Sequence, residues 1–327
     1  MTTLFPLLRL PRLALIPVFQ QMVPIDVIAF SLISQKARNL SKIFCKLSAS
    51  SVDMTVKSDH LYICVEFEMW IQIGLEYYFY TESAPQLVNA MFQKRAFTHK
   101  NSGLSASQWV KRVLDVTNCD SIDQLDLKGS PQVDVCDTFG KLQNIYKLSI
   151  FKDCTTSFAK KALEIILPVT REITFFRIQF ETREEFQTFL KSNLNYLTIN
   201  ACYFSMFTFD DLLVSNILKL KLREVKLSST DFSQFLTKWF HSKDNSRLEH
   251  LTLCTLGDIN ETCLPEVLNA IPFPVNEDRM FCYSKQLDTS TNTFRGGYDI
   301  RRADGKKATI KFVSLFGRTY IDFYVWP

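Results

Sequence analysis

Few residues of this 327-residue chain stand in a pattern that carries out chemistry. The run Gly305-Lys-Lys-Ala-Thr309 contains the residue types of a phosphate-binding loop, but it lacks the G-x-x-x-x-G-K spacing and follows a hairpin-turn signal. His250 and Cys254 share one face of a predicted strand but stand too far apart to hold one metal ion. None of the four histidines accompanies a serine or cysteine in the context of a nucleophile. We therefore expect no enzyme, no metal site and no cofactor.

A row of cations indicates a binding surface for a target protein. Lys219, Lys221 and Arg223 alternate along one predicted strand, so their side chains stand on the same face. An acidic or phosphorylated segment of a target protein would complement this charge, and phosphate geometry favours the arginine over the lysines. The alternative is an ordinary solvent-facing strand, because water tolerates the repulsion between like charges at a surface.

The strand that carries these cations is one of six that recur at nearly even spacing. Two apolar residues separated by one other residue occur as Leu125-Asp-Leu127, Leu148-Ser-Ile150, Ile173-Thr-Phe175, Leu197-Thr-Ile199, Leu220-Lys-Leu222 and Leu251-Thr-Leu253. Their second members are separated by 23, 25, 24, 23 and 31 residues. This period is typical of leucine-rich repeats, in which each unit contributes a strand and a helix. Only Cys202 matches the consensus Asn or Cys, so we predict a degenerate leucine-rich-repeat-like α/β solenoid; the alternative is an ordinary α/β domain.

Helical segments lie between these strands. Thr182-Arg-Glu-Glu185 matches a capping box, and apolar residues at helical spacing follow it. The longest apolar stripe of the chain is formed by Phe232, Phe235, Leu236, Trp239 and Phe240. Each unit is therefore expected to bury one helical face against the sheet.

Side chains alternate along a strand, so the residues between and beside each apolar pair are expected to face outward. They are Asp126, Lys128, Lys147, Phe151, Glu172, Phe176, Tyr196, Thr198, Asn200, Lys219, Lys221, Arg223, His250 and Thr252. Aromatic residues are the usual anchors of protein interfaces. We therefore predict that a target protein contacts Phe151, Phe176, Tyr196, Thr198, Lys219, Lys221 and Arg223. The alternative is that the C-terminal strands cover the aromatic residues, or that these residues are simply exposed.

The composition limits the class of protein. Hydrophobic residues make up 46% of the chain, which is ample for a core. The 38 basic and 34 acidic residues are interspersed and leave a net charge of only +4, so no nucleic-acid partner is expected. The alternative is a nucleic-acid binder that uses Arg295, Arg301, Arg302, Lys306, Lys307 and Lys311. The nine cysteines contain no C-x-x-C pair, which indicates buried, reduced thiols.

The N-terminal region is apolar but does not resemble a signal peptide. Prolines and arginines interrupt residues 3–23, and no run reaches the ~20 apolar residues of a membrane-spanning helix. We expect an intracellular protein, cytoplasmic or nuclear, with no membrane partner. An extended opening segment and short helices over residues 13–23, from Pro24 onward and over residues 35–44 carry more Leu and Ile than they can bury against each other, which indicates a partner site.

Three motifs in this region resemble the F-box, a three-helix module that docks on the Skp adaptor of Skp-cullin-F-box ubiquitin ligases. They are Phe5-Pro-Leu-Leu-Arg-Leu-Pro11, Met22-Val-Pro-Ile-Asp26 and Ala29-Phe-Ser-Leu-Ile33. The sequence departs from the family pattern at Pro17 and at Ser34-Gln-Lys-Ala-Arg38, which lacks an aromatic residue. The resemblance implies adaptor contact by Pro6, Leu8, Leu10, Pro11, Ile16, Pro24 and Ile28. The alternative is that these helices form a cap on the solenoid.

A second resemblance covers residues 182–273 and the C-terminal strands. The segments 228–239, 246–251 and 296–305 are similar to the type 2 F-box-associated domain, which follows the F-box in large nematode families. Together the two resemblances imply a substrate-recognition subunit that binds the Skp adaptor and the cullin complex at one end and an unknown target protein at the other. The alternative is a leucine-rich-repeat scaffold unrelated to ubiquitin.

The remaining segments complete the expected domain order. We expect an F-box over residues 1–45, a linker region with a β-hairpin over 46–104, the repeat array over 105–273, and a loop with a C-terminal β meander over 274–327. The hairpin is expected to turn near residues 68–70. Residues 264–270 are expected to form a short helix and 272–292 a loop. Asp304-Gly305 indicates a type I′ hairpin turn and Phe316-Gly317 a second turn.

Overall fold

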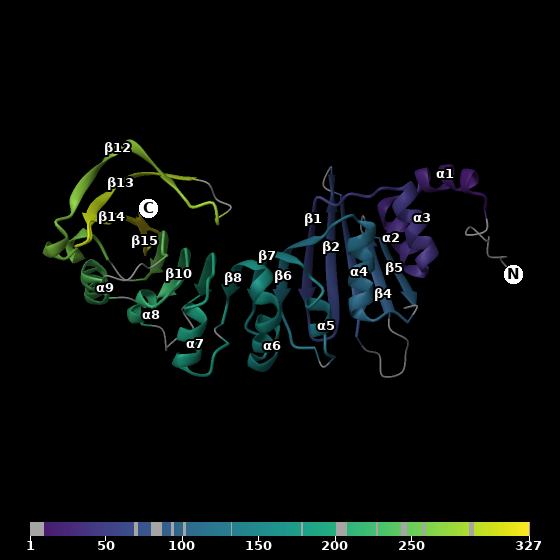
Figure 1. Ribbon diagram of the computed structural model, residues 1–327, viewed down its shortest axis with the longest axis horizontal. Helices are drawn as coiled ribbons and strands as arrows, with labels where there is room; N and C mark the ends of the chain where they lie inside the picture. The colour runs from purple at the N-terminus through teal and green to yellow at the C-terminus, as the bar shows by residue number, and fades with distance from the viewer. Residues whose placement is uncertain are drawn as a thin grey trace. The chain divides into compact units, whose positions relative to one another are not determined.

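The computed structural model describes residues 10–68, 71–79, 87–92, 95–100, 103–131, 133–177, 179–200, 208–226, 228–242, 247–256, 259–287 and 291–326. The chain divides into two compact units, Met1–Thr170 and Arg171–Pro327 (Figure 1). Each unit contains a mixed α/β arrangement and is described by itself below.

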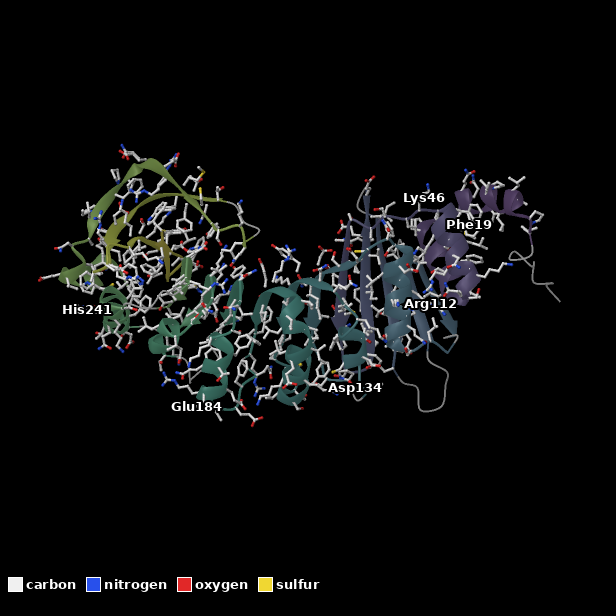
Figure 2. The ribbon with its side chains drawn as sticks, viewed as in Figure 1. Phe19, Lys46, Arg112, Asp134, Glu184 and His241 are labelled. Atoms are coloured by element: carbon white, nitrogen blue, oxygen red, sulfur yellow. The ribbon has the colours of Figure 1, made fainter. Side chains whose placement is uncertain are left out.

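The three expected N-terminal helices are present as α1 (Arg12–Gln21), α2 (Pro24–Ile33) and α3 (Gln35–Phe44). Pro24 occupies the first turn of α2, where a missing N–H group costs nothing. The Ser34 hydroxyl caps α3 by accepting the Ala37 N–H at 3.1 Å. Phe19 of α1, which is labelled in Figure 2, holds the group together. Its ring lies 5.4 Å from the rings of Phe30 and Phe44.

Residues 46–104 differ from the expected linker region. The expected hairpin exists as β2 (His60–Phe67) and β3 (Ile71–Tyr78), but it is the centre of an antiparallel group of five strands. The others are β1 (Ser51–Val56), β4 (Leu87–Phe92) and β5 (Arg95–Lys100). On β1 the alternating residues Val52, Met54 and Val56 are fully buried. This segment is therefore part of the core of the first unit.

The first unit continues with strand–helix alternation. It contains α4 (Ala106–Val116), β6 (Ser121–Leu127), α5 (Cys136–Phe139), β7 (Asn144–Ile150), α6 (Thr156–Ile166) and the 3₁₀ turn η3 (Leu167–Val169). Ser105 and Gln108 form a capping box at the start of α4. β6 pairs in parallel with both β1 and β7, so the sheet of this unit runs β7-β6-β1-β2-β3-β4-β5.

The second unit begins with parallel strands separated by helices. These are β8 (Thr170–Phe175), α7 (Arg183–Leu190), β9 (Tyr196–Asn200), α8 (Phe209–Leu213), β10 (Lys219–Val225), α9 (Ser229–His241) and β11 (His250–Thr255). The predicted apolar pairs meet in register, since Leu197 pairs with Leu220 and Leu220 with Leu251. The strand–helix alternation is confirmed, whereas the assignment to leucine-rich repeats stays a prediction.

The C-terminal meander has four antiparallel strands where three were expected. They are β12 (Ile271–Cys282), β13 (Thr291–Arg301), β14 (Lys307–Leu315) and β15 (Arg318–Val325), and β15 pairs antiparallel with β11. The expected loop over 272–292 is thus wrong for most of its length. Pro272 and Pro274 are tolerated because β12 is the edge strand of the sheet.

Two shorter elements precede the meander. They are the 3₁₀ turns η5 (Glu261–Cys263) and η6 (Glu266–Leu268). The short helix expected over 264–270 is therefore reduced to the single 3₁₀ turn η6, which ends where Asn269 adopts a left-handed conformation. The sheet of the second unit runs β12-β13-β14-β15-β11-β10-β9-β8.

Both hairpin turns predicted for the meander lie where expected, but the first differs from the predicted type. At the first turn only Gly305 has a positive φ, +94°, and the Arg302 N–H bonds to the Lys306 carbonyl at 2.8 Å. This turn is a three-residue loop with a left-handed glycine, so the type I′ prediction for it is wrong. At the second turn both Phe316 and Gly317 have positive φ, 52° and 70°, as a type I′ turn requires.

Candidate functional site

The N-terminal helices expose large apolar side chains. Leu13 is 81% exposed, Ile33 61%, Ile43 50% and Val23 42%. Beneath them Leu15, Phe19, Ile25, Val27 and Ile28 are buried. Large apolar side chains that remain exposed while others of their kind form a core are a common feature of partner-binding surfaces.

The residues predicted to contact an adaptor fall into three groups. Pro6 and Leu8 lie outside the described residues. Pro11 is exposed, and Leu10, Ile16 and Pro24 are half-buried. Ile28 has no exposed surface, because it faces the core of the helical group. Ile28 therefore has no surface with which to contact a partner, whereas the exposed Leu13, Val23, Ile33 and Ile43 were not among the predicted residues.

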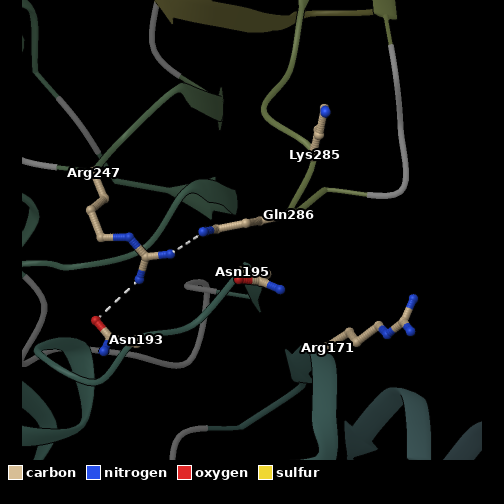
Figure 3. A pocket seen from close by; sticks show the side chains of 6 residues that line it. All are labelled: Arg171, Asn193, Asn195, Arg247, Lys285 and Gln286. Atoms are coloured by element: carbon tan, nitrogen blue, oxygen red, sulfur yellow. Dashed lines mark hydrogen bonds between the residues drawn. The ribbon is translucent and has the colours of Figure 1, made fainter. Parts of the chain in front are cut away.

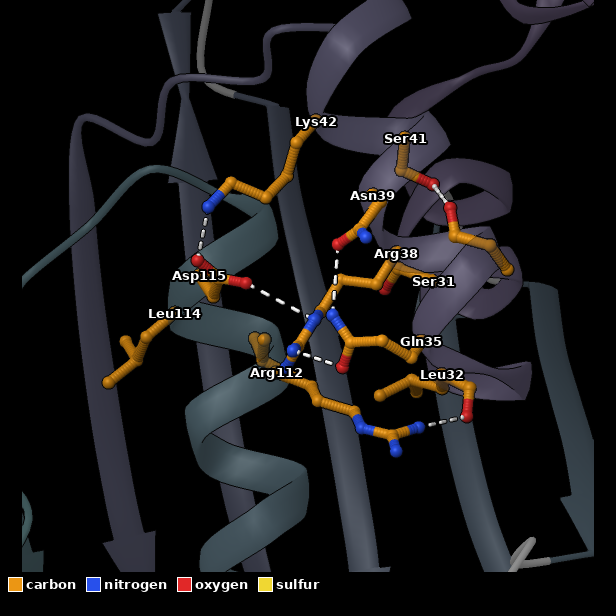
Figure 4. A network of polar contacts seen from close by, with 12 residues as sticks. Ser31, Leu32, Gln35, Arg38, Asn39, Ser41, Lys42, Arg112, Leu114 and Asp115 are labelled. Atoms are coloured by element: carbon orange, nitrogen blue, oxygen red, sulfur yellow. Dashed lines mark hydrogen bonds and ion pairs between the residues drawn. The ribbon is translucent and has the colours of Figure 1, made fainter.

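A polar network joins these helices to α4 (Figure 4). Asp115 of α4 pairs with Arg38 at 3.3 Å and with Lys42 at 2.5 Å, both on α3. Arg112 of α4 donates to the Leu32 carbonyl at 2.9 Å, at the end of α2. The helical group is thus anchored on the body of the first unit.

The predicted cationic row on β10 exists, but its members differ in access. Lys219 pairs in register with Tyr196 on β9 and with His250 on β11. Its ammonium group lies 4.9 Å from the ring centroids of both Tyr196 and Tyr283. Burial lowers the pKa of Lys219. Lys221 is half-buried, and only Arg223 is exposed.

The cover over this row comes from the meander. Leu218, Phe281, Tyr283, Leu287, Phe294 and Tyr324 form one buried cluster, against which Tyr196 and Trp326 pack. Phe294 and Tyr324 stack with centroids 4.4 Å apart, and Phe281 lies 5.2 Å from Tyr324. The inward-facing residues of β12 and its following turn therefore occupy part of the surface that was predicted to receive a target protein.

His250 is held in a hydrogen-bond network within the same region. Its Nδ1 lies 2.8 Å from the Tyr283 hydroxyl, and its Nε2 lies 3.0 Å from the Asp322 carboxylate. Thr252 also donates to Asp322, at 2.8 Å. Burial lowers the pKa of His250 and outweighs the opposing effect of Asp322, so the imidazole is neutral at neutral pH. The network links β11, β15 and the residue that follows β12, and it has the character of a structural contact.

The other predicted target contacts are dispersed. Thr198 is 7% exposed and therefore buried. Phe151 is half-buried in the first unit, where the Lys128 ammonium lies 5.0 Å from its ring centroid. Phe176 is half-buried in the second unit. Asp126 and His250, which were expected to face outward, are buried. Thr198, Asp126 and His250 are thus wrong as surface residues.

Two of the six basic residues named for the nucleic-acid alternative, Arg295 and Arg302, form ion pairs. Arg302 is buried, bonds to Asp304 and lies 5.8 Å from the Trp239 ring centroid. Arg295 pairs with Asp278 at 2.5 Å. This pairing weakens the nucleic-acid alternative, which needs positive charge left free for phosphates.

A second cationic site, which the sequence analysis missed, lies where the parallel strands of the second unit begin (Figure 3). It is a hollow of about 630 Å³ lined by Arg171, Asn193, Asn195, Arg247, Lys285 and Gln286. Arg171 is in β8, Asn195 immediately precedes β9, and Arg247 comes shortly before β11. Parallel strands bring these positions to one edge, although nothing in a linear pattern of apolar residues marks them.

Within the described parts of the chain, no three His, Cys, Asp or Glu side chains gather closely enough to hold a metal ion. Among the same residues no helix is long and apolar enough to cross a membrane.

Two family models match the chain. Residues 7–49 match the F-box domain, and residues 185–253 match the family described as F-box associated. The first match spans α1, α2 and α3, and the second runs from α7 to β11. No curated protein and no solved structure matches.

Proposed function

We propose that this chain, an F-box protein with an F-box-associated domain, is a substrate-recognition subunit of a Skp-cullin-F-box ubiquitin ligase. Its N-terminal helices dock on the Skp adaptor, and the second unit binds the target protein. The chain carries out no bond chemistry itself; it acts inside the cell, in the cytoplasm or nucleus, by bringing a target to the ligase.

The exposed apolar side chains of the F-box helices carry this proposal. Burying one Leu or Ile side chain contributes roughly 1.5 to 3 kcal/mol, and about 1.4 kcal/mol corresponds to a tenfold change in affinity. Leu13 and Ile33 are the two most exposed of these residues, so both have surface to bury against an adaptor. Their truncation removes little from the core of the free protein.

The test is a pull-down of the full chain with a purified Skp adaptor. We expect the wild-type chain to bind and the double variant Leu13→Ala plus Ile33→Ala to bind at least about tenfold more weakly. Gln20→Ala changes another exposed position of α1 and serves as the control, with unchanged binding expected. Absence of binding by the wild type, or equal binding by the double variant, would contradict the proposal.

A second candidate function is a protein-binding scaffold unrelated to ubiquitin, whose N-terminal helices only cap the fold. The observation that favours it is the packing of α2 and α3 on α4 through Asp115, Arg112 and their partners. Deleting residues 1–45 would break these contacts under either function, so a truncated chain does not separate them. The variants Leu13→Ala and Ile33→Ala do separate the two functions, because a helical cap makes no partner contact through the exposed Leu13.

We also propose that the strand–helix units of residues 105–273 are degenerate leucine-rich repeats. The in-register pairing of Leu197, Leu220 and Leu251 and the period of 23 to 25 residues over most of the array support this assignment. The longer final step comes from the polar segment before β11.

A further inference from the structure

We propose that the basic hollow of the second unit binds a phosphorylated side chain of the target protein. This inference deepens the proposed function, on which it rests for the identity of the ligand as part of a target. The described residues that line the hollow are the six named above: Arg171, Asn193, Asn195, Arg247, Lys285 and Gln286.

The charge of the hollow matches a phosphate dianion. Three of its six lining residues are cations and three are carboxamides, and no carboxylate is among those that the structure describes there. Glu172 and Glu249, which are close in sequence to Arg171 and Arg247, are not among the described lining residues, and Glu249 accepts the Ser284 N–H at 2.9 Å. An anion entering the hollow therefore meets the positive charges of Arg247 and Lys285, for which the described residues provide no carboxylate partner, together with neutral hydrogen-bonding groups.

Arg247 is held in place before any ligand binds. Its guanidinium donates to the Asn193 Oδ1 at 3.1 Å and to the Gln286 Oε1 at 2.6 Å (Figure 3). It also approaches the Asn216 carbonyl at 3.5 Å, and the Asn216 amide bonds to the same Asn193 oxygen. All these partners are neutral, so they orient the guanidinium without cancelling its charge. A preorganised arginine loses less conformational entropy when it binds an anion.

The same contacts fix the orientation of the two amides. An arginine can only donate hydrogen bonds, so the oxygens of Asn193 and Gln286 must face Arg247. Their NH₂ groups are then donors that Arg247 does not occupy. Charged donors and amide donors in one site are the combination that phosphate oxygens use.

The size of the hollow favours a protein segment over a free ion. Its volume of about 630 Å³ far exceeds the ~30 Å³ that one water molecule occupies in the liquid. A phosphate group alone would leave most of it empty, whereas a phosphorylated side chain with its flanking backbone would not. Lys285 is exposed, and within the described chain it has no ion-pair partner, so its ammonium group is available at the opening.

The test measures binding of fluorescein-labelled peptides to the full chain. The probe is a short Gly/Ala peptide with one phosphoserine; its twins carry Ser or Glu at that position. We expect the phosphopeptide to bind at least about tenfold more tightly than either twin, since phosphate offers a second charge and a third oxygen. Inorganic phosphate should compete, but at higher concentration than the peptide.

Two variants and a matched control locate the site. Arg247→Gln and Lys285→Gln should each weaken phosphopeptide binding by about tenfold, the effect of losing one charge-assisted hydrogen bond. Arg247 supports its neighbours, so the exposed Lys285 provides the variant that leaves the fold intact. Arg301→Gln removes an exposed cation of the same unit outside the hollow, and it should leave affinity within about twofold.

Several outcomes would overturn the inference. Equal binding of the phosphopeptide and its Ser twin would remove the anion site, and equal binding of the Glu twin would remove its preference for phosphate. An affinity loss for Arg301→Gln as large as that for Lys285→Gln would show general charge attraction. Equal affinity for inorganic phosphate and the peptide would point to a free ion as ligand. None of these results depends on the adaptor, so the Skp pull-down succeeds or fails separately.

Discussion

The second unit carries cations in two regions that differ in what covers them. On β10, Lys219 lies between the rings of Tyr196 and Tyr283, beside a buried aromatic cluster. At the edge where the parallel strands begin, Arg247 and Lys285 line a hollow among amides. Both regions are basic, but the first is a stabilising contact within the fold and the second is open to a ligand.

This difference shows that alternation along one strand predicts the direction of a side chain and does not predict its access to solvent. Lys219 does point away from the helices, as its position in β10 requires. Its access is decided by Tyr283, which follows it by 64 positions in the sequence. Two changes test whether the meander packs over β10. A third tests whether Arg223, the exposed residue of the cationic row, contributes to target binding.

The largest effect is expected from removing the cover. Phe281 has no exposed surface and contacts Tyr283, Tyr324 and Trp326, so Phe281→Ala should lower the free energy of unfolding by about 3–5 kcal/mol. Met280, its neighbour on β12, is 58% exposed, and Met280→Ala should change this energy by less than about 0.5 kcal/mol. Urea unfolding measures both, and a similar midpoint for the two variants would show that the meander does not form a core with the sheet.

A smaller effect is expected from pH, through His250. Burial lowers its pKa in the folded state below the ordinary value of 6.5, so the unfolded chain takes up a proton first as the pH falls. Stability that is present above about pH 6.5 should therefore decrease on acidification below it, by at most about 1.4 kcal/mol per pH unit. Burial raises the pKa of Tyr283 to about 12, and the pKa of Asp322 is lowered below its usual 3.8, so neither group titrates in this window.

Urea unfolding at pH 7.5 and 5.5 measures this effect in the wild type and in His250→Gln. The variant is expected to be less stable at both values, because Tyr283 and Asp322 lose their shared partner. Its stability should also depend less on pH over this range than that of the wild type. The same pH dependence in both proteins would assign the titration to another group.

The strands of both units were largely predictable because their signal is local. The paired apolar residues of β6 to β11 lie in the predicted strands, and the hairpin of β2 and β3 turns where expected. The helices after Thr182 and Ser228 also follow their caps, although Glu185 bonds to the Glu181 N–H in place of the reciprocal capping-box contact. In each case the burial of one apolar face and the local capping residues indicate the same element.

The failures occurred where an element depends on remote neighbours. β12 contains two prolines and a polar run, and it is a strand because β13 offers a partner and the sheet core accepts Phe281. The hollow could not be predicted for a similar reason. Each of Arg171, Arg247 and Lys285 carries no signal by itself. The parallel order of β8, β9 and β11 brings Arg171 and Arg247 to one edge, and the segment between β12 and β13 adds Lys285.

The same dependence on remote neighbours governs Ile28 and Leu13. Both are apolar residues of the N-terminal helices, and the motif resemblance favoured Ile28. Its burial depends on how α2 packs on α3, whereas Leu13 is left exposed on α1. Periodicity within one helix does not say which of two apolar faces is the core when three short helices pack together.

The smallest effect is expected at the open end of the β10 row. Arg223 is exposed, and its strand partner on β9 is Asn200. It therefore contributes little to stability, and Arg223→Gln should change the free energy of unfolding by less than about 0.5 kcal/mol. If the hollow is the phosphate site, the same variant should leave phosphopeptide affinity within about twofold, because charges separated by more than about 8–10 Å are largely screened at physiological salt.

Affinity capture of partners gives this prediction its sharpest form. Lys219→Glu plus Arg223→Glu is compared with Lys285→Glu, using the full chain in each case. The Lys219 change also buries a carboxylate beside Tyr283, so Arg223→Glu alone is the variant that reports on surface charge. We expect Arg223→Glu to retain the partners of the wild type and Lys285→Glu to lose those that depend on phosphorylation. If Arg223→Glu loses the same partners, target recognition takes place on the exposed face of β10. Only a ligand that lies along β10 would be sensitive to the charge of Arg223.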